Sequence, residues 1–155
     1  GDDILNTGLT RQSPLKSLAE AWRRIPPATR LDTIGHGFNV LLLEGSYTDL
    51  VPVYMEQRWG TFKYPIFIRS ADGAGKAVLP NLNIFNCTYL YLIGLRLVQG
   101  GGDVLHLEQG HHVLLRGLTI VGTGVIESYN CPQETLKVNQ LQHIYVEACD
   151  ISGAW

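Results

Sequence analysis

Apolar residues at helical spacing occur near the start of the chain. They are Leu15, Leu18, Ala19, Trp22 and Ile25, with charged residues between them. Such spacing is typical of an amphipathic helix whose apolar face is buried. Ser13 and Pro14 suit the first turn of a helix, and Pro26 and Pro27 would end it. The pattern predicts one helix at about residues 14–25.

After residue 39 the pattern changes to short apolar runs bounded by turn-forming residues. The clearest runs cover residues 40–43, 51–55 and 66–68. Apolar runs of this length, separated by turn formers, indicate β-strands. We therefore expect the chain beyond residue 39 to be built from strands.

Three segments further along the chain repeat one another without gaps. Residues 82–97, 105–120 and 136–151 align, and their starts lie 23 and 31 residues apart. Six columns are apolar in every copy: Leu82/Leu105/Leu136, Ile84/Leu107/Val138, Leu90/Val113/Ile144, Leu92/Leu115/Val146, Leu95/Leu118/Cys149 and Leu97/Ile120/Ile151. The columns between them are mostly polar: Asn83/His106/Lys137, Ile93/Arg116/Glu147 and Arg96/Thr119/Asp150. Because alternate side chains of a strand point to opposite faces, the apolar columns are predicted to point inward and the polar columns outward.

Two other columns indicate how each repeat changes direction. The column Gly94/Gly117/Ala148 is small in every copy, which suits a bend between two strands. The column Asn86/Gln109/Gln140 carries an amide in every copy. Side-chain amides stacked one above another can bond to each other, so we expect a ladder of amide hydrogen bonds there.

The length of the repeat favours a stack of coils made only of strands. A repeat of 23 residues without a helical period leaves no room for a crossover helix, whereas periods of this size are typical of solenoids. The eight additional residues of the longer interval fall within residues 122–133 and would form a projecting loop. The predicted fold class is therefore all-β, a parallel β-helix (solenoid) whose first coil is covered by the N-terminal amphipathic helix. We predict one domain over residues 1–155, with a cap at 1–39 and coils at 40–155.

Composition excludes several classes of protein. The chain is 45% hydrophobic and 17% charged, which suits one compact domain. A net charge of -2 gives no overall attraction for nucleic acid, and no apolar run is long enough to span a membrane. The three cysteines have no CxxC spacing, so neither a complete disulfide framework nor a zinc site is indicated.

The order of these segments resembles that of a known superfamily. Residues 45–49 (GSYTD) follow the predicted helix, residues 65–69 (PIFIR) form a strand pattern, and the three repeats come next. In this order the chain resembles the N-terminal portion of the pectate-lyase-like superfamily of right-handed parallel β-helix proteins. The resemblance implies a secreted protein, extracellular or periplasmic. It also implies that further coils follow, or that the open end associates with another copy.

The resemblance implies a carbohydrate-active protein rather than one particular reaction. Our first hypothesis is a polysaccharide lyase that acts on an acidic polysaccharide, since the superfamily includes lyases and glycosidases. The alternative is a non-catalytic carbohydrate-binding or surface-structural β-helix, because a fold alone does not determine function. Whether the protein is an enzyme stays open at this point.

The outward columns, and two carboxylates that lie two positions before the first inward residue of a repeat, supply the candidate site residues. The catalytic candidates are Lys137, Arg116 and His106; the substrate-binding candidates are Arg96, Glu147 and Asp150. Asp103 and Glu134 are candidates for a metal, with calcium implied by the resemblance. In such a lyase a cation stabilises the developing enolate while a basic side chain removes a proton. The alternative is a solvated face on which Arg116 and Glu147 form a cross-strand ion pair.

Three histidines present a second open choice. His112 and His143 share a column with Tyr89, and His111 lies beside them. Imidazoles on adjacent strands can bind a metal, but a third ligand is needed. The alternative is a stacked row of the three rings Tyr89, His112 and His143 near a turn.

Overall fold

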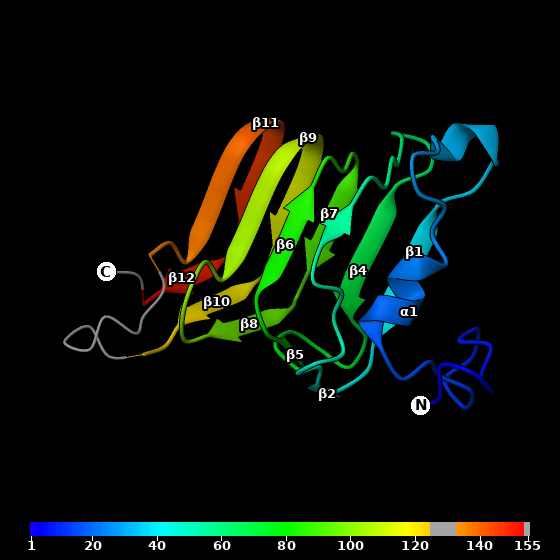
Figure 1. Ribbon diagram of the computed structural model, residues 1–155, viewed down its shortest axis with the longest axis horizontal. Helices are drawn as coiled ribbons and strands as arrows, with labels where there is room; N and C mark the ends of the chain where they lie inside the picture. Colours follow the sequence, from blue (N-terminus) through cyan, green and yellow to red (C-terminus); the bar gives the residue numbers. More distant parts are fainter. Residues whose placement is uncertain (125–132, 154–155) are drawn as a thin grey trace.

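Parallel strands make up most of the molecule (Figure 1), a computed structural model that describes residues 1–124 and 133–153. The helical elements are α1 (Leu18–Arg23) and the short 3-10 helix η1 (Leu31–Thr33). The strands are β1 (Phe38–Leu42), β2 (Gly45–Ser46), β3 (Met55–Glu56), β4 (Ile66–Ser70), β5 (Ala77–Leu79), β6 (Leu82–Phe85), β7 (Leu90–Ile93), β8 (Arg96–Gln99), β9 (Leu105–Arg116), β10 (Thr119–Gly122), β11 (Leu136–Glu147) and β12 (Asp150–Ser152). The prediction of a chain built from strands beyond residue 39 is confirmed for the described residues.

The three repeats pair in parallel and in the predicted register. Leu82 is the partner of Leu105, and Leu105 is the partner of Leu136. The same register continues on a second sheet, where Leu97 pairs with Ile120 and Ile120 pairs with Ile151. One sheet has seven strands and the other has five, ordered β12-β10-β8-β5-β2. Figure 1 shows the strands following one another along the long axis, from β1 beside α1 to β11 and β12.

The seven-stranded sheet curls because its long strands bend in the middle. The first part of β9 pairs with β6, and its last part pairs with β7. Gln109 and His112 lie between these parts with φ of 50° and 55°, in the left-handed region. β11 repeats the bend at Gln140 and His143, where φ is 52° and 53°. The two halves of each long strand therefore face different directions.

The amide column marks this bend, and the expected amide ladder is wrong. No hydrogen bond joins the side-chain amides of Asn86, Gln109 and Gln140 in the part of the chain that the structure describes. The main-chain amide of Asn86 donates instead to the carbonyl of Glu108, the residue before Gln109, at 2.8 Å. The expectation of a bend at the small column is confirmed, because φ is 64° at Gly94, 61° at Gly117 and 52° at Ala148.

Burial of the inward columns depends on position in the stack. Their members in the first two repeats are all buried, with at most 4% of the side chain exposed. In the third repeat Val138, Val146 and Ile151 are 39%, 46% and 39% exposed. Within the described residues β11 and β12 each pair on one side only. The inward prediction is therefore confirmed where strands lie on both sides, and the third repeat is partly open to solvent.

The N-terminal helix is shorter than predicted. Its N-cap is Ser17, whose hydroxyl accepts from the amide of Glu20, and the predicted start at Ser13 and Pro14 is wrong. The carboxylate of Asp3 accepts from the amides of Lys16 and Ser17, and this holds the preceding turn in a non-helical form. The predicted apolar face is buried at Leu18, Trp22 and Ile25. None of the described helices has the length and apolarity to cross a membrane.

Other strand boundaries differ from those that the sequence pattern predicts. Of the run at residues 51–55 only Met55 is in a strand, because Pro52 cannot donate to a ladder and Val53 and Tyr54 are exposed. Strand β5 was not predicted, although Ala77 and Leu79 are buried in the core. Of the predicted loop at 122–133, residues 125–132 lie outside the described residues.

Candidate functional site

The structure places the eight candidate residues on three separate surfaces. His106, Lys137, Asp103 and Glu134 lie around the first halves of β9 and β11. Arg116 and Glu147 lie at the ends of the second halves, beyond the bend. Arg96 and Asp150 lie on the other sheet, in β8 and β12. The sequence columns therefore do not converge on one groove.

Lys137 is held by two carboxylates. Its Nζ lies 3.3 Å from Oδ2 of Asp103 and 3.5 Å from Oε2 of Glu134. Hydrogen bonding and attraction to Asp103, and then to Glu134, raise the pKa of Lys137. A base must lose its proton before it can accept another. The arrangement therefore favours a structural ion cluster over a catalytic base at Lys137.

The same cluster does not fit calcium. Calcium takes six to eight oxygen ligands, as a rule, and here the ammonium group of Lys137 lies beside both candidate carboxylates. Within residues 1–124 and 133–153 no group of three or more His, Cys, Asp or Glu residues is placed to hold a metal ion. We therefore derive no calcium-dependent step from Asp103 and Glu134.

Removing the ammonium group should create a calcium response. In Lys137→Ala the carboxylates of Asp103 and Glu134 would lose their shared cation, and repulsion between them would favour a divalent ion. We expect saturating calcium to raise the melting temperature of this variant by about 2–4 °C. The melting temperature of the wild type should not respond to calcium or to EDTA.

A thermal unfolding series with and without calcium checks this prediction. Lys76→Ala is the matched control, because Lys76 pairs with the single carboxylate of Glu44 at 3.1 Å. A calcium-induced rise in the wild type would show that the carboxylates already bind the ion. An equal rise in both variants would show that the effect is not specific to the cluster.

His106 belongs to a neighbouring polar group on the same surface. Its Nε2 lies 3.5 Å from Oε2 of Glu108 and 3.4 Å from Nδ2 of Asn139. In register His106 is the partner of Lys137. The two catalytic candidates are therefore adjacent, but each has its own polar partners.

Arg96 and Asp150 are separated by another strand. Thr119 of β10 is the register partner of both. Two strand spacings amount to about 9.6 Å, which is too far for an ion pair between aligned positions. These two substrate-binding candidates therefore do not form a pair.

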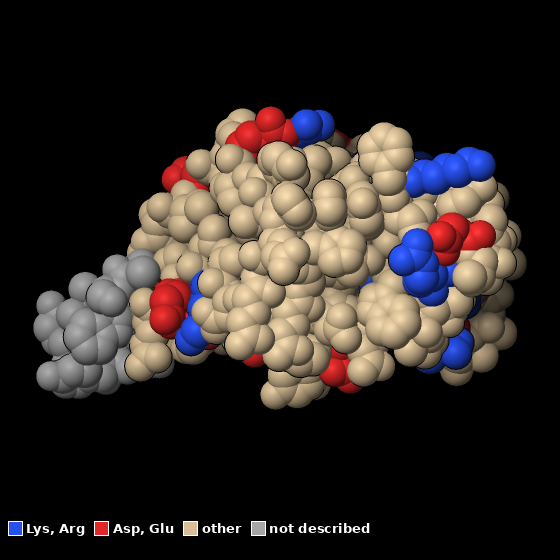
Figure 2. All heavy atoms as spheres, turned by 90° about the horizontal axis from the view of Figure 1, so that it is seen from above, with Lys and Arg blue, Asp and Glu red and all other residues tan. Residues whose placement is uncertain are grey.

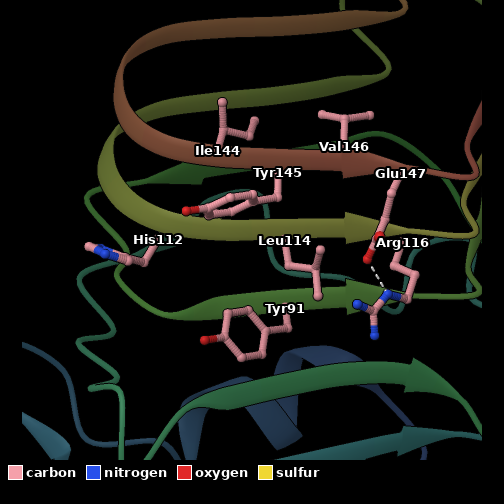
Figure 3. Close-up of a pocket in the computed structure, with 8 residues that line it drawn as sticks. All are labelled: Tyr91, His112, Leu114, Arg116, Ile144, Tyr145, Val146 and Glu147. Carbon is pink, nitrogen blue, oxygen red and sulfur yellow. Dashed lines mark hydrogen bonds and ion pairs between the residues drawn. The ribbon is translucent and has the colours of Figure 1, made fainter.

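Arg116 and Glu147 form the predicted cross-strand ion pair. Nε of Arg116 donates to Oε1 of Glu147, and the two residues are register partners on β9 and β11. They border a hollow of about 550 Å³, together with Tyr91, His112, Leu114 and Tyr145 (Figure 3). Two tyrosine rings thus lie beside this pair; among the other candidates, His106 borders a smaller recess of about 280 Å³.

A row of apolar side chains runs beside this pair on the outer face. Register partners on successive strands place Asn39, Phe67, Tyr91, Leu114 and Tyr145 in one line. We call Phe67, Tyr91, Leu114 and Tyr145 the outer row. The rings of Phe67 and Tyr91 meet edge to face at 5.1 Å between centroids. Burial raises the pKa of Tyr91, so its hydroxyl stays protonated at neutral pH.

The sequence carries a signal for the outer row in one outward column of the repeat. Tyr91, Leu114 and Tyr145 occupy an outward position of the repeat, yet none is charged. Outward positions of a solvated sheet are expected to be polar. An apolar outward column is therefore a sign of a binding surface, and a row of partly exposed apolar side chains that ends at the exposed Tyr145 supports that interpretation.

The aromatic rings at the bend stack rather than surround a metal. Tyr89 and His112 are stacked at 4.4 Å between centroids, and His112 lies 4.6 Å from His143. Nδ1 of His111 is 2.9 Å from Nδ1 of His112, so one nitrogen carries a hydrogen that the other accepts. Burial and the neighbouring His112 and His143 lower the pKa of His111. The row Tyr89, His112 and His143, which we call the ring row, matches the stacked alternative.

A cysteine nucleophile has no support in the described residues. Burial raises the pKa of Cys87 to about 12, and only 2% of this residue is exposed. A thiol reacts as its thiolate, which Cys87 does not form at neutral pH. Cys149 donates weakly from Sγ to the carbonyl of Leu115 at 3.5 Å. Both therefore serve packing.

The outer row and the ion pair of Arg116 with Glu147 together form a surface beside a recess, and this surface can bind a ligand. Apolar rings can stack on a flat ligand, and the ion pair and hydroxyls can form directional bonds to it. Comparison of the chain with protein-family models, with curated proteins and with solved structures gives no match in any of the three.

Proposed function

We propose that this chain forms coils of a right-handed parallel β-helix of the pectate-lyase-like kind. Support comes from the in-register parallel pairing of three repeats and from the buried inward columns. In a β-helix the open side of β11 and β12 would be covered by another coil, from a longer chain or from a second copy. The exposed apolar residues Val138, Val146 and Ile151 are consistent with such a contact.

We further propose that the protein binds polysaccharide along the outer row. The observation that carries this proposal is the line of Phe67, Tyr91, Leu114 and Tyr145 on the outer face. Successive side chains in such a line are about 4.8 Å apart, close to the length of one pyranose unit in an extended chain. The CH-rich face of a pyranose can pack on each ring, while Arg116 and Glu147 bond to hydroxyl groups at the edge of the chain.

The pairing of the charged groups favours a protein that binds polysaccharide without catalysing a reaction on it. Lys137 is protonated and held by Asp103 and Glu134, and Arg116 is paired with Glu147. Neither group is placed as an unpaired base beside the outer row. The best-supported function is therefore that of a carbohydrate-binding protein.

Binding by variants of single tyrosines tests the proposal. Tyr145 is 58% exposed, so Tyr145→Ala should leave the fold intact. We expect its affinity for the bound polysaccharide to fall about tenfold, a loss of about 1.4 kcal/mol. Affinity electrophoresis through gels containing xylan, galactan, polygalacturonate, alginate or hyaluronate would first identify the ligand, and calorimetry would measure the affinities.

Tyr54→Ala is the matched control for this experiment. Tyr54 is 64% exposed and precedes β3, away from the outer row. Its loss should leave binding unchanged. The proposal fails if the wild type binds none of the five polysaccharides, or if Tyr145→Ala binds as tightly as the wild type.

A polysaccharide lyase is the second candidate. The observation in its favour is that Arg116 and His112 line the same hollow as Tyr91 and Tyr145. These side chains supply a cation and a titratable ring beside a site for sugar. Release of unsaturated uronate products, followed by their ultraviolet absorbance, would establish this activity. Absence of any product from a polysaccharide that the protein binds would reject it.

A further inference from the structure

A second recess lies on the other side of the ring row. It has a volume of about 920 Å³ and is lined by residues that include Trp59, Lys63, Thr88, Tyr89, Gln109 and His111, which we call the corner groove. Tyr89 lines the corner groove, whereas its stacking partner His112 lines the hollow beside the outer row. The ring row thus separates two neighbouring recesses. The size of the corner groove is in the range of ligand sites.

The floor of the corner groove is an ordered line of side chains. Parallel bridges connect Arg30 to Trp59, Trp59 to Thr88 and Thr88 to His111. Nε1 of Trp59 donates to the carbonyl of Asn86 at 3.1 Å, and Oγ1 of Thr88 donates to the carbonyl of Gly60 at 2.7 Å. These bonds fix the indole and the hydroxyl before any ligand arrives. A preorganised floor reduces the entropic cost of binding.

The charges at the rim favour a negative ligand. Arg30 donates to both carboxylate oxygens of Asp32, at 3.3 Å and 2.8 Å, so this pair is neutral overall. Lys63 also lines the groove and has no carboxylate within ion-pair distance among residues 1–124 and 133–153. Its Nζ lies 5.2 Å from the centre of the Tyr64 ring. The groove therefore has one cation without a counter-charge.

The face of the molecule on which β9 and β11 bend carries few charges over its middle. Figure 2 views the molecule from the side on which β9 and β11 bend and shows mainly uncharged surface, with charged side chains toward its margins. Phe62 adds an aromatic ring that is 86% exposed. A ligand for this side should therefore combine an apolar ring face with a single negative charge. In the outer hollow, by contrast, the charges of Arg116 and Glu147 balance.

We propose that the corner groove is a second carbohydrate site, and that it takes a sugar unit carrying a carboxylate. The inference rests on the proposed function, because it places an acidic unit of the same polymer beside the outer row. The sugar ring packs on Trp59, its hydroxyls meet Thr88 and Gln109, and its carboxylate pairs with Lys63. Specificity for acidic sugars then comes from the corner groove and general affinity from the outer row.

Short oligosaccharides distinguish the two sites. The probes are a trimer of galacturonic acid and a neutral trimer of galactose, titrated into the full chain at low ionic strength. We expect Lys63→Gln to weaken binding of the acidic trimer at least fivefold and to leave the neutral trimer unaffected. Lys16→Gln is the control, because Lys16 is an exposed lysine near the N-terminus that does not line the groove.

A second variant locates the acidic trimer. Tyr145→Ala should weaken polymer binding but should leave the trimer affinity within twofold of the wild type. If Lys63→Gln binds the acidic trimer like the wild type, or if Tyr145→Ala abolishes trimer binding, the corner groove is not the acidic site. Polymer binding lost through Tyr145→Ala would still support the proposed function in that case. If neither the trimers nor any polymer bind, both proposals fail.

Discussion

Leu115→Ala is expected to lower the free energy of unfolding by about 2–5 kcal/mol, the usual cost of removing a buried leucine side chain from a well-packed core. Leu115 is completely buried, and its register partners are Leu92 in the preceding repeat and Val146 in the following one. The truncation would leave a cavity between strands that hydrogen bonds hold on both sides. Denaturant unfolding followed by circular dichroism measures the change through the midpoint, with the slope as a check on two-state behaviour.

Val146→Ala provides the control within the same column. Val146 points inward like Leu115 but is 46% exposed, because β11 pairs on one side only within the described residues. Its truncation should cost less than about 1 kcal/mol, as is usual at partly exposed positions. Equal losses for Leu115→Ala and Val146→Ala would mean that the third repeat is covered in solution. Such a result would support the proposed contact with another coil, whereas a small loss for Leu115→Ala would contradict the core described here.

The inward columns could be predicted from the sequence because strand geometry is periodic. Alternation of side chains is a local property, and comparing three copies removes most of the ambiguity of any one strand. Leu92 and Leu115 were assigned correctly for this reason. The exposure of Val146 could not be read from its column, since it depends on whether another strand follows in space.

The bends were harder to predict because they depend on backbone conformation at residues other than glycine. Gln109 and His112 adopt positive φ, a conformation that residues other than glycine seldom adopt. The amide column predicts hydrogen bonds between side chains. In the structure its members share a backbone conformation with positive φ instead. The bend also explains why the candidate residues do not lie on one surface, since it directs Lys137 and Glu147 of the same strand to different surfaces.

The site itself was predicted only in part. The pairing of Arg116 with Glu147 followed directly from the alignment, because register partners on adjacent strands lie side by side. The outer row was not predicted, because its signal in the sequence is the absence of charge at outward positions such as Tyr91 and Tyr145. The corner groove joins Arg30, Trp59 and His111 from distant parts of the sequence, and only the stacking of strands brings them together.

Gly110→Ala is expected to destabilise the protein by about 3 kcal/mol, the upper end of the usual cost of overpacking. A Cβ at Gly110 would lie 2.3 Å from the carbonyl oxygen of Cys87, and that carbonyl also accepts from the amide of His111. Main chain cannot move aside as a flexible side chain does, so the bend between Gln109 and His112 would have to open. Because the bend positions the ring row, the variant should also lose affinity for the acidic trimer. Thermal and denaturant unfolding, followed by titration of the folded fraction, would measure both effects.

Gly117→Ala separates steric clash from backbone strain. Gly117 also has a positive φ, of 61°, but a Cβ there would meet nothing within 4 Å. Ala148 already occupies the same column with a φ of 52°, which indicates that a methyl group is accommodated at this bend. The expected loss is about 1–2 kcal/mol, from the left-handed conformation alone. If Gly110→Ala cost no more than Gly117→Ala, the close approach of β9 to Cys87 would be wrong, and the fixed corner on which the second carbohydrate site depends would be wrong with it.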